Sequence, residues 1–384
     1  MSSLQGTSDA LLANLNLSFQ RYAMNLLTKV FSITSLIFLA ACGGGSGALP
    51  EPTYVVSTFA GTADQSGTTD GTGSVARFNS PQGIVFDSFG NIFVMDGGNS
   101  TIRKITPSGV VTTFAGTPGQ RGSADGVGAS ASFEDGRALA IDRHGNLFVT
   151  EPSSNTVRKI TPDGVVSTFA GSAGQSGSAD GVGAEARFNF PYGVAVDALD
   201  NVIVSDMYNG TIRKITPNGV VTTIAGTAGM SSINDGIGAD ARFHFPAALA
   251  VDKSGNIYVT EWDARVIRKI TPAGHVTTVA GTLMHDGSVD GNASSAQFSY
   301  LNGLTVDKNG NIFVVDFGNQ TIRKITAAGM VSTIAGMARQ SGSTDGQGLA
   351  SKFNQPAYIA IDNNDNLFVS EIWNHTIRKL TISN

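Results

Sequence analysis

The apolar and polar positions of this 384-residue chain repeat in steps of 55 residues. The alternating phrase TIRKIT, or a close variant, begins at Thr101, Thr156, Thr211, Val266, Thr321 and Thr376. A second phrase, VSTFAG or a close variant, recurs at the same step from Val56 to Val331. Because no insertion breaks this register, residues 55–384 form six units of 55 residues.

Each unit contains the pattern of four short strands. In the first unit, GIVFD (residues 83–87) is short and apolar, and a DSFGN turn leads to NIFVMD (residues 91–96). TIRKIT then alternates, and Pro-Ser-Gly leads into VVTTFAG (residues 110–116). Antiparallel strands repeated around an axis predict an all-β fold, a six-bladed β-propeller of four-stranded blades. A solenoid fits less well because the first and last units are as regular as the others.

The last unit ends without its fourth strand, while one extra strand stands at the start of the repeats. The chain finishes TIRKLTISN, and VVSTFAG (residues 55–61) precedes the first complete unit. We expect residues 55–61 to pair with residues 376–381, so that the N-terminal strand completes the last blade. Such pairing closes the ring and leaves no open strand edge at the seam.

The repeated motifs resemble those of a known family. The pattern P-x-G-x-x-x-D, then G-N-I-F-V-x-D, then N-x-T-I-R-K-I-T resembles the NHL repeat, and the preceding D-G-x-G-x-x-A-x-F tract resembles its extended bacterial version. The resemblance covers residues 55–384 and implies a propeller. It implies little about activity, because the family includes receptor-kinase sensor domains, RNA-binding domains and a zinc-dependent peptidylamidoglycolate lyase.

The first 54 residues differ from the repeats. Lys29 precedes a short apolar run that ends in Leu-Ala-Ala-Cys, and a Gly/Ser stretch follows Cys42. This resembles a bacterial lipoprotein signal, too short to span a bilayer as a helix. We expect residues 1–41 to be a signal segment, for which Met24 is a better start than Met1. We expect cleavage before Cys42, lipidation of Cys42 and a flexible tether over residues 42–54. The lipid would anchor the protein to a membrane outside the cytoplasm, at the periplasmic leaflet or the cell surface. The alternative is a buried structural cysteine.

Composition and charge exclude several classes of function. Charged residues make up 14% of the chain and the net charge is −5, so nothing attracts nucleic acid in general. Cys42 is the only cysteine, which excludes a disulfide framework and a cysteine-based metal site. We expect a monomer without a cofactor.

Two sets of acids recur in register, and we assign both to the fold. In the first set, we expect each Asp to cap a short helical turn and not to bind calcium. This set is Asp70, Asp125, Asp180, Asp235, Asp290 and Asp345. In the second set, we expect each acid to accept hydrogen bonds from the following turn or from the nearby strand arginine, and not to form an acidic rim for a ligand. This set is Asp96, Glu151, Asp206, Glu261, Asp316 and Glu371.

Function is expected where the repeat breaks. Breaks fall in the segments that enter the innermost strands and in the loops between second and third strands, and strand alternation places both on one face. This face is distal to the anchor, and we expect it to bind a protein, peptide or glycan partner. The residues expected to contact the partner are Arg137, Tyr192, Tyr208, Trp262, Asp263, Arg265, Asn302, Phe317 and Trp373. The alternative is that the tryptophans only pack between neighbouring loops.

Signs of an enzyme are few, so no catalytic or metal-binding residue is assigned. The five histidines fall at non-equivalent positions of the repeat, and no G-x-S-x-G motif occurs. The innermost strands read as apolar up to a closing Asp that orders the next turn. A non-enzymatic binding or scaffold module is therefore the favoured hypothesis. A calcium- or zinc-dependent hydrolase, lactonase or lyase with its site in the central channel is the alternative.

Overall fold

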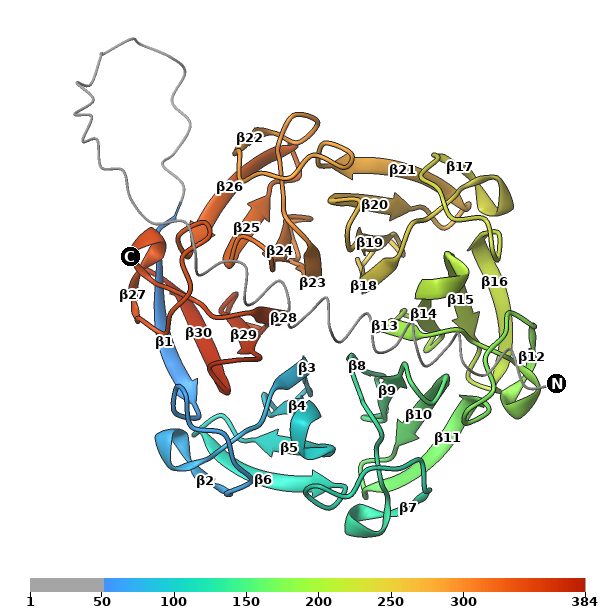
Figure 1. Cartoon of the computed structure of the whole chain (residues 1–384), viewed down its shortest axis with the longest axis horizontal. Coiled ribbons are helices and arrows are strands. Elements are labelled where there is room, and N and C mark those ends of the chain that lie inside the picture. Colours follow the sequence, from blue (N-terminus) through green and yellow to red (C-terminus); the bar gives the residue numbers. More distant parts are fainter. Residues whose placement is uncertain (1–51, 384) are drawn as a thin grey trace, which may run out of the picture. The chain divides into compact units, whose positions relative to one another are not determined.

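The computed structural model describes residues 52–383, and in it six antiparallel sheets stand around a central axis (Figure 1). This confirms the predicted all-β, six-bladed β-propeller. The predicted signal segment, Cys42 and most of the tether lie outside the described residues. No helix among the described residues is long and apolar enough to cross a membrane.

Each blade is one sheet, and its strands follow one another from the outer edge inward. Blade 1 holds β2 (Gly71–Thr72), β6 (Val110–Ala115), β5 (Thr101–Ile105), β4 (Ile92–Asp96) and β3 (Pro81–Phe86). Blade 2 holds β7 (Gly126–Val127), β11 (Val165–Gly171), β10 (Thr156–Ile160), β9 (Leu147–Glu151) and β8 (Leu139–Ile141). Blade 3 holds β12 (Gly181–Val182), β16 (Val220–Gly226), β15 (Thr211–Ile215), β14 (Val202–Asp206) and β13 (Pro191–Val196).

The remaining blades have the same order. Blade 4 holds β17 (Gly236–Ile237), β21 (His275–Ala280), β20 (Val266–Ile270), β19 (Ile257–Glu261) and β18 (Pro246–Val251). Blade 5 holds β22 (Gly291–Asn292), β26 (Met330–Ala335), β25 (Thr321–Ile325), β24 (Ile312–Asp316) and β23 (Leu301–Val306). Blade 6 holds β27 (Gly346–Gln347), β1 (Tyr54–Ala60), β30 (Thr376–Ile382), β29 (Leu367–Glu371) and β28 (Pro356–Ile361). Single 3₁₀ turns connect some strands: η1 (Gly73–Val75), η2 (Gly97–Asn99), η3 (Gly128–Ser130), η4 (Gly183–Glu185), η5 (Met207–Asn209), η6 (Gly238–Asp240) and η7 (Gly348–Ala350).

The blades have five strands, so the prediction of four was wrong by one strand. The fifth is a two-residue strand in the Gly-rich tract before each innermost strand. In blade 1, Gly71 pairs with Val111 and Thr72 with Val110. The sequence pattern missed these strands because two residues are too few to show alternation. They give partners to backbone groups on the outer edge of each blade, where an open edge could pair with another chain.

The ring closes as predicted, with the N-terminal strand completing blade 6. Strand β1 pairs antiparallel with β30, from Tyr54 opposite Ile382 to Ala60 opposite Ile377. It begins at Tyr54, one residue before the predicted start. Tyr54, Val56 and Ala60 are buried, so this strand contributes to the core as well as to the seam.

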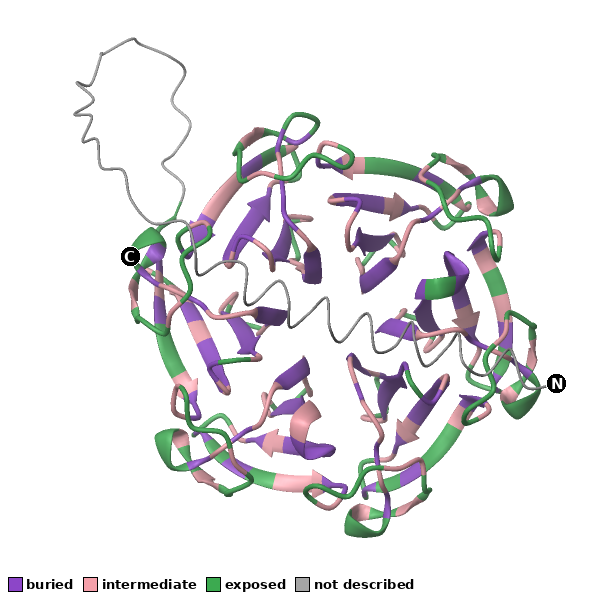
Figure 2. Cartoon of the chain, in the orientation of Figure 1, coloured by how far each residue is buried: buried purple, intermediate pink, exposed green. Residues whose placement is uncertain are grey.

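The innermost strands of neighbouring blades are in backbone contact around the axis, and Figure 2 shows them as largely buried. The Gly83 amide donates to the Arg137 carbonyl of the next blade at 2.7 Å. A Cβ atom at Gly193 would collide with the Ala247 carbonyl oxygen, and one at Gly303 would lie 2.5 Å from the Tyr358 Cα. Glycine is therefore required at these positions by close packing, whereas the equivalent residues of blades 2, 4 and 6 are Ala138, Ala248 and Tyr358.

A buried arginine links two acids in every blade. One nitrogen of its guanidinium lies 2.6–3.0 Å from an acid that ends the second strand, and the other lies 2.6–2.8 Å from an acid of the Gly-rich tract. Each arginine also lies over a phenylalanine ring, 4.8–5.6 Å from its centroid. The arginines are Arg103, Arg158, Arg213, Arg268, Arg323 and Arg378, all at most 1% exposed.

This link confirms one prediction about the repeated acids and corrects the other. Asp96 accepts hydrogen bonds from Arg103 and from the Asn99 amide of the following turn, as predicted for its set. Asp70 was predicted to cap a helical turn, but η1 has Thr72 at its N-cap and no side-chain cap. Asp70 instead accepts from Arg103 and from Thr113, because the Gly-rich tract lies along the outer strand beside the arginine.

Burial works against the charge of the inner acids. It raises the pKa of Asp96, Asp206 and Asp316 to about 6 and that of Glu261 to about 7, although amide donors and the arginine favour the ionised form. These acids have no exposed surface. The arginine is therefore what keeps a buried carboxylate compensated in each blade.

We predict that Arg213→Met lowers the free energy of unfolding by about 3–5 kcal/mol, the cost of leaving a buried charge without its partner. Asp180→Asn is the matched control, because the Asp180 side chain is 49% exposed. It should cost about 1 kcal/mol or less. Urea unfolding followed by far-UV circular dichroism measures both values, and equal losses would contradict the role given to the inner pair.

Candidate functional site

Polar side chains gather where the innermost strands begin. The prediction that these strands are apolar up to their closing Asp was wrong at this end, because it left out the residues that begin them. Equivalent positions of the six blades carry Gln82, Arg137, Tyr192, Ala247, Asn302 and Ala357, and the next position of blade 6 carries Tyr358. Gln82, Tyr192, Asn302 and Tyr358 are at most 9% exposed, and Arg137 is half-buried. We call these five polar residues the channel-mouth cluster.

Hydroxyl groups of neighbouring blades fix the backbone of this cluster. Thr150 of blade 2 donates to the Tyr192 carbonyl of blade 3 at 2.6 Å. Thr260 donates to the Asn302 carbonyl at 3.0 Å, and Ser370 donates to the Gln82 carbonyl at 2.6 Å. Each bond crosses from one blade to the next, so the cluster sits on a rigid frame, as a preorganised site requires.

The hydroxyl of Tyr192 is central to the cluster. Burial raises its pKa, and nearby Arg137, Asn302 and Tyr358 lower it in part. Burial also raises the pKa of Tyr358 well above its ordinary value, and the neighbouring Tyr192 phenol adds to this effect. Both phenols are therefore neutral at physiological pH and can donate a hydrogen bond.

Several polar atoms of the cluster lack a protein partner. Among the described residues, none pairs with Gln82 Oε1, Asn302 Oδ1 or Arg137 Nε, although all three atoms are buried. Buried polar groups are nearly always satisfied, by protein or by water. These atoms are covered in the structure, so water or a polar ligand group would reach them only when the side chains around them move.

Aromatic rings border the channel mouth on blades 3, 4 and 5. Phe190, Phe245 and Tyr300 occupy the position just before the innermost strand with φ of 63°, 54° and 52°, a left-handed conformation that is rare for bulky residues. Ser80 and Gln355 share this conformation at the equivalent position, with φ of 52° and 51°, so it belongs to the repeated turn and not to the aromatic site alone. Together with three rings from the loops between second and third strands, the aromatic residues at this position form what we call the aromatic arc: Phe190, Tyr208, Phe245, Trp262, Tyr300 and Phe317.

The arc is built from ring contacts within and between blades. Tyr208 stacks on Phe190 with centroids 4.5 Å apart, and Phe245 meets Tyr208 edge-on at 5.9 Å. Trp262 lies 5.7 Å from Tyr300 and 5.1 Å from Phe317. These contacts place both predicted loop classes side by side on one face, which we call the loop face. The face that carries the turns after Asp87 and its equivalents is the turn face.

The arc reaches the channel-mouth cluster at blade 3. Phe190 stacks toward Tyr192 with centroids 6.3 Å apart, and the Arg137 guanidinium lies 6.0 Å from the Tyr192 ring centroid. Burial raises the pKa of Tyr208, and the charge of Arg137 opposes this effect. A ligand lying on Tyr208 would therefore be near the polar mouth.

The other predicted residues form the rim of the arc or lie outside it. Asp263 is 2.9 Å from His244 Nδ1, and the Arg265 guanidinium lies 5.0 Å from the Tyr300 ring centroid. Trp373 is 46% exposed on blade 6, and no ring contact joins it to a described aromatic side chain. The structure thus brings Arg137, Tyr192 and Asn302 together. It groups the blade 3–5 residues separately and leaves Trp373 apart.

Exposure distinguishes the aromatic residues. Trp262 is partly buried between Tyr300 and Phe317, as the alternative of packing between loops expects. Tyr208 is 40% exposed on top of Phe190. The arc therefore combines rings that support the loops with rings that remain accessible.

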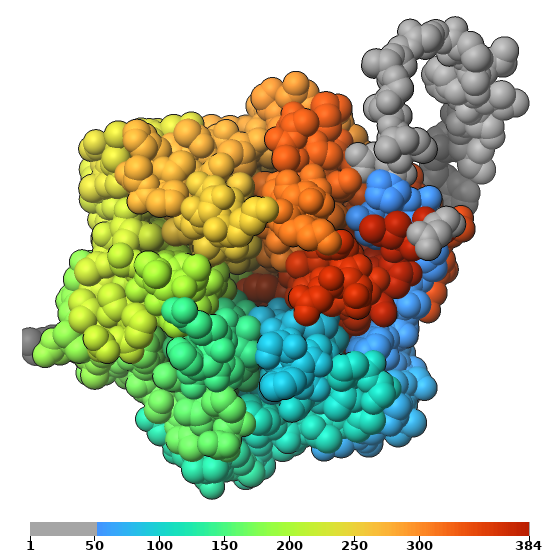
Figure 3. Space-filling model, turned by 180° about the vertical axis from the view of Figure 1, so that it is seen from behind, coloured from blue at the N-terminus to red at the C-terminus, as the bar shows by residue number. Residues whose placement is uncertain are grey.

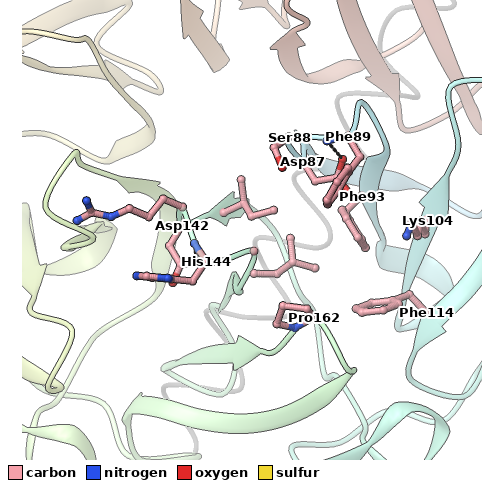
Figure 4. Close-up of a pocket in the computed structure, with 13 residues that line it drawn as sticks. Asp87, Ser88, Phe89, Phe93, Lys104, Phe114, Asp142, His144 and Pro162 are labelled. Carbon is pink, nitrogen blue, oxygen red and sulfur yellow. Dashed lines mark hydrogen bonds between the residues drawn. The ribbon is translucent and has the colours of Figure 1, made fainter.

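A second hollow lies between blades 1 and 2 on the turn face, with a volume of about 450 Å³. Figure 4 shows Phe93 and Phe114 on one side of it and Asp142 and His144 on the other. Asp142 accepts from the backbone amide of His144 and so orders its own turn, as predicted for this set of acids. The channel mouth is the stronger candidate, because its buried polar atoms are not used by the fold. Figure 3 shows one face of the ring, hollowed where the blades meet.

A metal site does not stand out among the side chains. No group of three or more His, Cys, Asp or Glu residues within residues 52–383 is placed to hold a metal ion. His244, His285 and His375 belong to different blades.

Sequence reasoning missed Gln82, Tyr358 and the left-handed aromatic position. Comparing equivalent positions could have found Tyr358, because the other blades carry glycine or alanine there. Gln82 occupies the position of the repeat that is equivalent to Arg137, Tyr192 and Asn302, and it could have been found by the same comparison. The left-handed backbone conformation at Phe190 and Phe245 has no signal in a single sequence, because phenylalanine rarely adopts it.

Comparisons with known proteins place the chain among repeat propellers. Residues 298–325 match the NHL repeat family. Suppressor of quenching 1, chloroplastic, from Arabidopsis thaliana is 26% identical over 281 residues, and NHL repeat-containing protein 2 from Bos taurus is 28% identical over 188 residues. These matches cover 69% and 46% of this chain. They span 26% of each relative, so the chain corresponds to about a quarter of their length.

Two solved structures are similar in fold. An auxiliary nutrient-binding protein from Bacteroides ovatus matches over 87% of this chain and 78% of its own, with a TM-score of 0.66 and 16% identity. An inactive virginiamycin B lyase from Staphylococcus aureus, solved with quinupristin, matches over 86% of this chain and 100% of its own. Its TM-score is 0.53 and its identity is 16%. The likeness therefore shows a shared fold between this chain and both binding and catalytic propellers.

His375 supplies a pH-sensitive contact at the seam between blades 6 and 1. Its Nδ1 accepts a hydrogen bond from the Ser80 backbone amide at 3.1 Å. The side-chain oxygens of Asn155 and Gln320 accept the equivalent bonds from the backbone amides of Phe190 and Gln355 in the blades that follow them. Burial lowers the pKa of His375 below its ordinary value of 6.5. As pH falls, His375 is therefore protonated in the unfolded chain before it is protonated in the folded one. The stability that this contact contributes is lost as pH falls below about 6.5.

We predict that the wild-type protein loses up to about 1 kcal/mol between pH 7 and pH 5 from this contact, the net value of one hydrogen bond. His375→Gln should keep the acceptor, as Gln320 does in blade 5, and should show a smaller loss over the same range. Urea unfolding at both pH values measures the difference. Identical pH dependence in the two proteins would show that the contact does not titrate.

Proposed function

This chain is a six-bladed β-propeller built from NHL repeats, and on that basis we propose that it is a binding module, without enzymatic activity of its own, for a glycan. The observation that carries the proposal is the aromatic arc beside a polar channel mouth. Flat rings offer faces for the C–H surfaces of sugar rings, and buried donors and acceptors fix the orientation of hydroxyl groups. The auxiliary nutrient-binding protein of similar fold is consistent with such a role.

The remaining features of the loop face fit this ligand. Tyr208 is accessible on top of Phe190, and both lie beside Tyr192. Rigid aromatic anchors lose little conformational entropy on binding, so a few of them can carry most of the affinity. Arg265 and Asp263 at the rim can add polar contacts. A protein or peptide partner for the same face is the other outcome that a binding test can reveal.

An enzyme is the second candidate, because a virginiamycin B lyase shares the fold. A hydrolase, lactonase or lyase of this kind would hold calcium or zinc in the central channel. The channel-mouth cluster supplies amide, phenol and guanidinium groups, which favour recognition of a polar ligand over binding of a metal ion.

We also propose that Cys42 is lipidated and that the protein is anchored outside the cytoplasm. The support is the lipoprotein-like segment that ends at Cys42. Strand β1 begins at Tyr54, opposite the end of β30 and therefore on the turn face. An anchor joined to that end would leave the loop face free for a ligand.

We predict that the full-length protein in detergent binds members of a glycan array, and that Tyr208→Ala and Trp262→Ala each weaken the strongest interaction at least about tenfold, as expected for hot-spot residues. Phe89→Ala, on the turn face and 83% exposed, is the control and should bind like wild type. Isothermal titration calorimetry gives the affinities. Equal affinity in all variants would contradict the site, and stoichiometric calcium or zinc together with turnover of a lactone or glycoside would favour the enzyme.

We predict that Cys42→Ser moves the protein from the membrane fraction to the soluble fraction of a bacterial expression host, because a serine cannot accept the thioether-linked lipid. Radiolabelled palmitate should label the wild-type protein and not the variant. Equal partitioning and no label in either protein would contradict the anchor and leave the ligand site unaffected.

A further inference from the structure

Arg137 breaks the repeat in a way that two other positions support. Blade 2 has Gly136 where four blades have proline, and Met95 of blade 1 replaces the threonine, serine or valine of the other blades. A Cβ atom at residue 136 would lie 2.5 Å from the Met95 sulfur. The two breaks therefore pack against each other, and the chain beside them carries the arginine into the channel mouth.

The positive charge of Arg137 is not neutralised by an ion pair with another described residue. Its Nε is also buried without a partner in the part of the chain that the structure describes. The missing ion pair distinguishes Arg137 from the six repeated arginines, each of which links two acids, whereas an unpartnered Nε is shared by five of those six. Burial raises the pKa of the neighbouring Asp135 and the charge of Arg137 lowers it in part, but Asp135 accepts its hydrogen bonds from the amide and hydroxyl of Ser153, at 3.1 and 2.5 Å.

Neutral donors converge on the same place. The Tyr192 ring lies under the guanidinium, and its hydroxyl lies near Asn302 and Tyr358. Both phenols are buried and protonated, so they can donate to an oxygen but cannot neutralise a cation. A guanidinium beside phenol and amide donors is a suitable environment for a carboxylate, which accepts several charge-assisted hydrogen bonds.

We propose that the channel mouth recognises the carboxylate of a sugar acid, a uronic acid residue of the bound glycan, with Arg137 as its counter-ion. The sugar part of this inference rests on the proposed glycan binding, whereas the carboxylate part rests on the channel-mouth cluster alone. Tyr192 and Asn302 orient the carboxylate, and the sugar ring lies toward Phe190 and Tyr208. The ligand oxygens also give an acceptor to the terminal guanidinium nitrogens of Arg137, which make no hydrogen bond to another described residue.

The test compares digalacturonate with its dimethyl ester, which keeps both sugars and removes both carboxylate charges. Calorimetry on the full-length protein in detergent should show the acid binding at least about tenfold more tightly than the ester, the range of a buried charge-assisted bond. Arg137→Gln should lower the affinity for the acid to that of the ester and leave the ester unchanged. Arg137→Lys should retain part of the preference.

The other outcomes separate this inference from the proposed function. Equal binding of acid and ester by the wild type, or binding of neutral glycans only, overturns the carboxylate site and leaves glycan binding intact. Preference for a peptide with a free terminal carboxylate over both sugars overturns the sugar acid and the glycan proposal together. No binding to any of these probes contradicts the carboxylate site, and the glycan array then decides the proposed function separately. The wild-type comparison remains decisive even if Arg137→Gln fails to fold.

Discussion

The buried arginine between two acids is the interaction on which the rest of this propeller depends. It occurs in all six blades with nearly the same distances, and it joins the second and third strands to the Gly-rich tract on the outside. The inner acid and the arginine are buried, and the outer acid is bonded to the same arginine, so the charge that looks functional in the sequence is structural. A blade that contains its own satisfied ion pair can repeat without change, and function is left to positions that do vary.

Close packing at the axis decides where those positions are. Gly83, Gly193 and Gly303 have no room for a side chain, because the next blade is in backbone contact. Variation is therefore confined to the first residues of the innermost strands and to the loops above them. Arg137, Tyr192 and Asn302 occupy such positions, held by hydroxyl bonds from the neighbouring blades. The site is an irregular surface on a regular frame, which is how propellers carry different functions on one fold.

The sequence was sufficient for most of the fold, because period, strand pattern and ring closure are all local or repeated signals. It predicted that the acids ending the second strands pair with arginines, since residues such as Asp96 and Arg103 recur together. It could not show the two-residue outer strands or the partners of Asp70, which depend on tertiary contacts. For the site, Arg137 and Asn302 were found as breaks in the repeat, and Tyr192 was assigned to the same face. Their joint burial with Gln82 and Tyr358 depends on how six blades meet at the axis, which no single unit encodes.

The most direct test of this account is a crystal structure of the protein soaked with digalacturonate. The account predicts the disaccharide at the channel mouth of the loop face, with a carboxylate oxygen within about 4 Å of the Arg137 guanidinium, the limit for an ion pair, and a sugar ring against the aromatic arc. Density for the disaccharide in the groove between blades 1 and 2 on the turn face, with an empty channel mouth, would contradict it.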